Sequence, residues 1–112
     1  MMKRGVFSNN KRKLLVKVEA EHELFKYKML ASPVKDVYER CNEIRFYECV
    51  YEYFRYCESI TEEYMKACLK ESEIIAALWR TYIENEYLKI DTWEDIEDLM
   101  LVMKERQKQK KD

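Results

Sequence analysis

Apolar residues recur along most of the chain in steps of three and four, which places them on one face of a series of α-helices. The strongest signal is in residues 46–57, where aromatic and aliphatic side chains cover most of a helical wheel. The only polar residues there are Glu48, Glu52 and Arg55, which share one narrow strip. A helix that is apolar around most of its circumference must be covered by several others. We therefore expect residues 46–57 to lie at the centre of the fold.

A first helix is predicted before this segment, from about Lys11 to Leu30. Its core face is Leu15, Val18, His22, Phe25 and Met29. Ser32 and Pro33 then indicate the start of another helix. The serine hydroxyl can accept a hydrogen bond from an unpaired amide of the first turn, and a proline in that turn has no amide proton to pair.

The stretch between Pro33 and the aromatic segment carries an apolar stripe of its own. This stripe consists of Val34, Val37, Cys41 and Ile44. It points to the opposite side of the helical wheel from the aromatic face of residues 46–57. Neither Gly nor Pro lies between the two stripes, so we expect one long central helix over about 33–58 that buries opposite faces in its two halves. A break near 42–45 is the alternative.

Three shorter helices follow, and each begins at a predicted capping residue, namely Thr61, Ser72 or Asp91. The first of them closes near Lys70. The core face of the second is Ile74, Ile75, Leu78, Trp79 and Tyr82. The inward residues of the last are Trp93, Ile96, Met100 and Met103.

Together these patterns predict an all-α fold, a compact bundle of five or six helices around the long central helix. We expect a single helical domain over residues 11–107. Residues 1–10 are predicted to form a disordered basic arm, and residues 108–112 a frayed basic tail.

Composition supports this fold class. Of the 112 residues, 47% are hydrophobic and 38% are charged, which suits one globular domain with a modest core. A single glycine and a single proline leave little turn chemistry for a sheet. No apolar run approaches the roughly 20 residues that span a bilayer, and the N-terminus lacks the apolar stretch of a secretory signal. We expect a cytoplasmic protein that does not bind membranes.

The formal net charge of −1 hides an uneven distribution. Residues 19–103 carry 20 acidic and 10 basic side chains, whereas residues 1–18 carry six basic side chains and no acidic one. Residues 104–112 are predominantly basic as well. The chain is therefore an acidic body with two basic ends.

The basic N-terminal region is a candidate nucleic-acid contact. Its residues are Lys3, Arg4, Lys11, Arg12 and Lys13. Such a cluster can neutralise backbone phosphates without reading the base sequence. The alternative is a solubilising arm that the acidic body partly neutralises.

The sequence predicts no catalytic site, metal site or cofactor site, and we do not expect an enzyme. Its one histidine, His22, lies in the core face of the first helix, where we expect a packed or edge side chain. The only glycine is Gly5, so a glycine-rich phosphate loop is excluded. The cysteines lack the spacing of a zinc site, and we expect them to act as small core residues. They are Cys41, Cys49, Cys57 and Cys68.

Tyrosines and acidic residues supply the candidate protein-binding surface. The tyrosines lie at the edges of the aromatic segment, where a ring can either line the core or contact a partner. The densest acidic run opens the last helix, where it either complements the helix dipole or contacts a basic partner. The predicted partner-binding residues are Tyr47, Tyr51, Tyr56, Glu48, Glu52, Asp91, Glu94, Asp95, Glu97 and Asp98.

Five short stretches carry a resemblance to a known family. They are residues 21–25, Ser32-Pro33 with Tyr38 and Glu43-Ile44, residues 48–54, Thr61-Glu62-Glu63 with Ala67-Cys68-Leu69, and residues 93–96. In order and spacing, the chain from about Leu14 to Arg106 resembles a family of unknown function, small helical proteins encoded by anaerobic gut bacteria and their phages. The resemblance implies a compact helical domain in a mobile-element setting, hence in the cytoplasm of a bacterial host. It brings no active site.

We therefore expect a non-catalytic protein-interaction module that acts by stoichiometric binding through an acidic, tyrosine-rich surface. The resemblance implies a mobile-element setting, so we expect this module to act as a phage or mobile-element antagonist or modulator of a bacterial host defence protein. The alternative is a nucleic-acid-associated regulator that uses the basic N-terminal arm. A homodimer is a further alternative, because tyrosine and methionine side chains at the margins of the apolar faces can line a contact between two copies of the chain as well as a contact with another protein.

Overall fold

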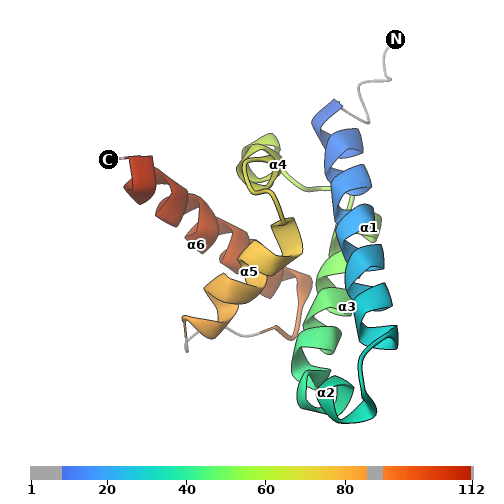
Figure 1. The fold of residues 1–112 in the computed structure, drawn as a ribbon. Helices are drawn as coiled ribbons and strands as arrows, with labels where there is room; N and C mark the ends of the chain where they lie inside the picture. Colours follow the sequence, from blue (N-terminus) through green and yellow to red (C-terminus); the bar gives the residue numbers. More distant parts are fainter. Residues whose placement is uncertain (1–8, 86–89, 112) are drawn as a thin grey trace.

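The computed structural model describes residues 9–85 and 90–111 of the chain. Over these residues the chain forms six helices and no strand, which confirms the predicted all-α fold (Figure 1). The helices are α1 (Asn9–Leu30), α2 (Val34–Glu39), α3 (Cys41–Tyr56), α4 (Glu62–Leu69), α5 (Ile74–Ile83) and α6 (Trp93–Lys111).

The two longest helices, α1 and α6, lie on opposite sides of the molecule (Figure 1). α1 and α3 run side by side, and α2 forms the corner between them (Figure 1). α6 packs on the other side against α3, α4 and α5. α4 and α5 lie between α1 and α6 and contact both. α1 therefore packs against three helices, α3, α4 and α5.

The aromatic segment supplies the centre of the core, as predicted. Val50, Tyr53 and Phe54 of α3 are completely buried. The other completely buried large side chains among the described residues come from every helix except α2. They are Leu14 and Val18 from α1, Cys68 from α4, Ile74, Ile75 and Leu78 from α5, and Ile96, Leu99 and Met100 from α6.

The favoured single helix over residues 33–58 is wrong, because the chain bends at Arg40. α2 ends and α3 begins on either side of this residue, whose φ is −105° and ψ is 19°. Of the stripe Val34, Val37, Cys41 and Ile44, only Ile44 of α3 packs against the core. α2 consequently has no buried residue, and Val34 is 85% exposed. Ser32 does not cap α2 either, since its hydroxyl donates to the Lys28 carbonyl at 2.7 Å.

The helical domain extends further than predicted at both ends. α1 begins at Asn9, within the predicted arm, and α6 continues through the predicted tail to the penultimate residue. The first turn of α1 is tied down because the Asn10 side-chain amide donates to the Glu62 carboxylate at 2.8 Å. The rest of the predicted ends, residues 1–8 and 112, lie outside the described residues.

The helix caps agree with the prediction in part. The Thr61 hydroxyl accepts the Tyr64 N–H at 3.3 Å and caps α4, as predicted. At α6 the capping box is displaced by one residue from Asp91. The Asp95 carboxylate accepts the Thr92 N–H at 2.9 Å, and the Thr92 hydroxyl accepts the Asp95 N–H at 3.4 Å. This reciprocal pair satisfies two amides of the first turn.

Lys17 of α1 binds the C-terminal end of α4. Its ammonium donates to the carbonyls of Leu69 and Glu71. The last carbonyls of a helix have no partner within the helix, and the helix dipole makes this end favourable for a cation. Lys17 therefore fixes the end of α4 against α1.

Glu21, one turn further along α1, binds the N-terminal end of α5. Its carboxylate accepts the N–H groups of Ile75 and Ala76, each at 2.8 Å. It thereby takes the place of the predicted cap Ser72, and the N-cap residue Glu73 makes no side-chain cap bond. We call Lys17 and Glu21 the junction clamp, because together they hold the ends of two successive helices.

Removal of the Glu21 carboxylate should destabilise the fold. We expect Glu21→Ala to lower the free energy of unfolding by about 1–2 kcal/mol, since two amides of α5 lose their acceptor. Urea denaturation followed by circular dichroism measures the change.

The matched control is Glu23→Ala, on the same helix. Glu23 is exposed and its ion pair with Lys26 has an N–O distance of 4.0 Å. Its loss should therefore change the stability by no more than about 0.5 kcal/mol. Equal effects of the two substitutions would show that Glu21 does not act as the cap of α5.

Candidate functional site

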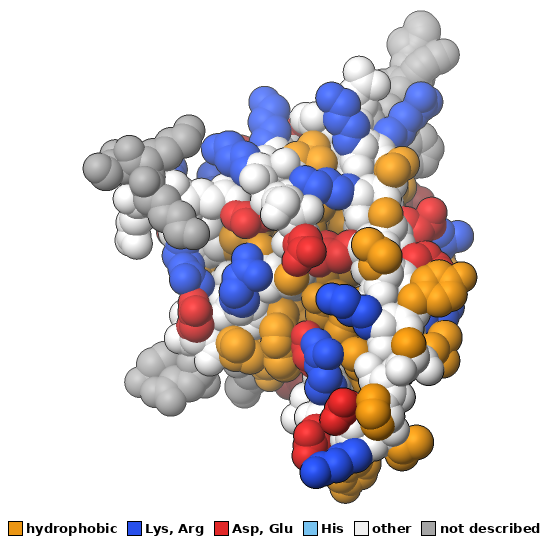
Figure 2. All heavy atoms as spheres, viewed as in Figure 1, with side chains coloured by type: hydrophobic (Ala, Val, Ile, Leu, Met, Phe, Trp, Pro, Cys, Tyr) orange, Lys and Arg blue, Asp and Glu red, His pale blue; other side chains and the backbone are white. Residues whose placement is uncertain are grey.

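α1 is apolar on two opposite faces, and the fold covers only one of them. The buried face carries Leu14, Val18, His22, Phe25 and Met29. The outer face carries an exposed stripe with steps of four, four and three residues, formed by Val16, Ala20, Leu24 and Tyr27. Val16 is 71% exposed and Leu24 is 67% exposed. Figure 2 shows hydrophobic side chains following α1 along the side of the molecule.

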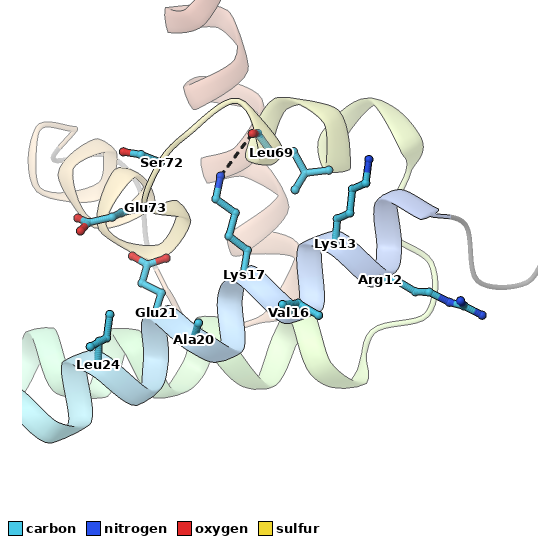
Figure 3. A pocket seen from close by; sticks show the side chains of 10 residues that line it. All are labelled: Arg12, Lys13, Val16, Lys17, Ala20, Glu21, Leu24, Leu69, Ser72 and Glu73. Carbon is cyan, nitrogen blue, oxygen red and sulfur yellow. Dashed lines mark hydrogen bonds between the residues drawn. The ribbon is translucent and has the colours of Figure 1, made fainter.

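A groove of about 730 Å³ runs between this outer stripe and the junction of α4 and α5. Its apolar part is formed by Val16, Ala20 and Leu24 on one side and by Leu69 on the other. Figure 3 shows Val16, Ala20 and Leu24 along α1, with Leu69 and the α4–α5 junction opposite. The small side chain of Ala20 leaves the middle of the groove open.

One end of the groove is basic. Arg12 and Lys13 line it, and both are exposed. On the opposite side Lys70 directly follows Leu69, and Lys66 lies one turn earlier on α4. None of these four cations takes part in an ion pair among the described residues. Figure 2 shows Lys and Arg side chains gathered at this end of the molecule, at the top of the view.

The other end of the groove contains Glu21 and Glu73. Burial against α5 raises the pKa of the Glu21 carboxyl, and the nearby charge of Glu73 acts in the same direction. The hydrogen bonds from Ile75 and Ala76 lower this pKa but do not outweigh the burial. The groove is therefore apolar along its length, positive at one end and acidic at the other.

The predicted tyrosine edge of α3 is only partly available to a partner. Tyr47 is 6% exposed and stacks on Phe25 with a centroid distance of 3.8 Å, so its prediction as an accessible residue is wrong. Tyr51 is half-buried and stacks on His22 at 4.1 Å. Tyr56 is exposed, as predicted.

Glu48, on the same edge, joins α3 to α1. Its carboxylate lies 2.7 Å from Nε2 of His22, which is buried, so the packed histidine is confirmed. The side chain of Glu48 is itself about half exposed. Glu52 is exposed and takes part in no ion pair among the described residues. This edge therefore contributes mainly to the contact between the two helices.

The acidic run at the start of α6 does not converge on one site. Asp95 serves as a cap, and the Glu97 carboxylate accepts a hydrogen bond from the Tyr53 hydroxyl at 3.1 Å. Asp91, Glu94 and Asp98 are exposed. Over the described ranges, no group of His, Cys, Asp and Glu is placed to hold a metal ion.

The basic residues proposed for nucleic-acid contact are divided. Lys3 and Arg4 lie outside the described residues. Lys11 is 8% exposed and donates to the Cys57 carbonyl at 2.8 Å, so its prediction as a free basic residue is wrong. The aliphatic stem of a lysine can pack in a core when its ammonium finds an acceptor. Arg12 and Lys13 remain exposed and line the groove.

Two of the four cysteines lie in the core, as predicted. Cys57 and Cys68 are buried, and burial raises the pKa of the Cys68 thiol to about 12, which keeps it neutral and unreactive. The prediction is wrong for Cys41, which is exposed in the first turn of α3, and for Cys49, which is partly exposed. Cys41 lies opposite the buried face of α3, and Cys49 lies at the edge of that face.

Comparison with known proteins identifies no relative of the chain. No family model matches the chain, and neither the curated proteins nor the solved structures compared with it give a significant match. The resemblance to the family from gut bacteria and phages therefore stays a prediction. In the part of the chain that the structure describes, no helix is both long enough and apolar enough to cross a membrane.

The groove is the feature that the sequence interpretation missed. A signal for it is present, because Val16, Ala20, Leu24 and Tyr27 recur at helical spacing on the outer side of the first helix. A helical wheel identifies two apolar faces on this helix. Only the packing of the other helices decides which face is buried.

Because folding raises the pKa of Glu21, the free energy of unfolding should depend on pH. A carboxyl with a higher pKa in the folded than in the unfolded chain binds its proton more tightly when folded. Its contribution to stability is complete below the unfolded pKa and is lost as the pH rises through the folded pKa. We expect the stability of the wild type relative to Glu21→Gln to fall as the pH rises from about 4 towards neutrality.

Urea midpoints of the two proteins at a series of pH values measure this difference. A constant offset between them reports the lost hydrogen bonds, and only the slope reports the titration. A difference that stays constant or grows with pH would mean that the pKa of Glu21 is not raised by folding.

Proposed function

We propose that the chain is a protein-binding module, and that the outer face of α1 receives a helix of a partner protein. The observation that carries the proposal is the exposed apolar stripe of Val16, Ala20, Leu24 and Tyr27 beside the groove. Soluble monomers rarely leave a continuous apolar stripe uncovered, and such stripes often mark contacts with other proteins.

The form of the stripe favours a helix as the occupant. Steps of four, four and three residues match the seam along which two helices pack. Ala20 in the middle allows a second backbone to approach closely, and Leu69 forms a wall that keeps the incoming helix on the stripe. A partner segment in extended conformation fits this surface less well, because its side chains alternate with a period of two residues and do not match the spacing of the stripe.

The location of the binding surface differs from the one expected from the sequence. The tyrosine edge of α3 is largely used to hold α3 against α1, whereas Val16, Leu24 and Tyr27 of the α1 stripe are each at least 67% exposed. The proposed role is still stoichiometric binding. The resemblance described above supports a phage or mobile-element antagonist or modulator of a bacterial host protein as the setting.

Charged side chains introduced on the stripe should abolish binding without unfolding the domain. We expect Val16→Asp combined with Leu24→Asp to reduce the amount of captured partner at least tenfold in affinity capture from a bacterial lysate, because an aspartate must be desolvated in the contact. Circular dichroism should show an unchanged helix content, since both positions are exposed.

Tyr56→Asp is the matched control, because Tyr56 is exposed at the end of α3, outside the groove lining. It should capture the same proteins as the wild type. Capture of the same proteins by the groove variant and by the wild type would contradict the proposal.

A further inference from the structure

We infer that the groove selects an acidic amphipathic helix, a refinement that rests on the proposed function. Basic side chains lie at one end of the apolar stripe. Arg12 and Lys13 lie on α1 one turn before Val16, at an axial distance of roughly 5 Å. Lys70 follows Leu69 on the opposite wall. Arg12 and Lys13 therefore place positive charge at this end of the groove.

These cations are available to a ligand. Lys17, the other cation in the groove, is engaged by the carbonyls of Leu69 and Glu71. Arg12 and Lys13 have no ion-pair partner among the described residues. Arg12 and Lys13 are exposed and line the groove, so they make this end of it positive.

A helix that covers the apolar stripe brings its own flanking side chains to this end. Carboxylates one turn beyond its apolar residues lie next to Arg12 and Lys13, and their charge accelerates association and fixes the register. Basic side chains at the same positions are repelled. The apolar contact thus supplies affinity for helices in general, and the basic end supplies the preference among them.

Nucleic acid fits this surface less well than an acidic helix. A phosphate backbone can pair with the cations, but it leaves Val16 and Leu24 exposed to water. It also approaches Glu21 and Glu73 at the far end of the groove, which repel it. A protein helix is therefore the expected ligand, and nucleic acid is the alternative that the experiment below tests.

Three labelled peptides test the inference by fluorescence anisotropy with the full chain. Each has about 18 residues, which span ~27 Å as a helix, and the same leucine stripe. The flanking positions are Glu in the first, Gln in the second and Lys in the third. We expect the Glu peptide to bind about tenfold more tightly than the Lys peptide at low salt, and the difference to shrink as salt is added.

Charge reversal on the protein should invert this order. In the double variant Arg12→Glu/Lys13→Glu, we expect the Lys peptide to bind more tightly than the Glu peptide. The double variant Lys28→Glu/Lys35→Glu changes the net charge equally at two exposed positions outside the groove lining, and Lys28 lies roughly 22 Å beyond Lys13 along α1. It should keep the wild-type order.

The outcomes separate the inference from the proposed function. Equal binding of all three peptides, lost in the Val16→Asp/Leu24→Asp variant, overturns the acidic preference and leaves a general helix-binding groove. Absence of binding to any peptide, with a partner still captured through the stripe, also overturns the inference alone. A duplex oligonucleotide that binds more tightly than the Glu peptide and depends on Arg12 and Lys13 overturns it in favour of nucleic acid.

Discussion

The junction clamp is the contact on which the arrangement of the helices depends. Lys17 and Glu21 are separated by one turn of α1, and they bind the carbonyl end of α4 and the amide end of α5. The charge order on α1, a cation followed by an anion, matches the dipole order of two helices joined head to tail. The α4–α5 junction is therefore held at one place along α1, and this also fixes the wall of the groove.

The clamp explains why a groove exists on this side of α1. The α4–α5 junction is attached to α1 by polar side chains from the flank of the helix and not by the apolar outer stripe. Val16, Ala20 and Leu24 consequently remain beside the junction without being covered by it.

Much of the fold could be predicted from the sequence, because most apolar stripes serve the core directly. The aromatic face of residues 46–57, the buried His22 and the Thr61 cap follow from local patterns of residues and were predicted correctly. Failures occurred where tertiary packing decides. Val34 lies on a helix that the core does not cover, and Lys11 is buried because a distant carbonyl accepts a hydrogen bond from its ammonium.

The candidate site could not be predicted in the same way. Its apolar half is visible as a second stripe on the first helix, but its far wall comes from Leu69, more than 40 residues away. Tyr47 illustrates the converse case, since its position at the edge of an apolar arc suits a surface residue as well as a core one. Only its stacking on Phe25 decides between them.

The clamp also determines when α1 can complete its contacts during synthesis. The residues that Lys17 and Glu21 bind lie 52–55 positions later in the chain. Until the ribosome has made residues 69–76, the clamp contacts cannot form, and the outer stripe of α1 is exposed. Such a nascent helix is a substrate for chaperones and prone to aggregate. The outer stripe is thus a surface that the newly made chain presents before the domain around it has formed.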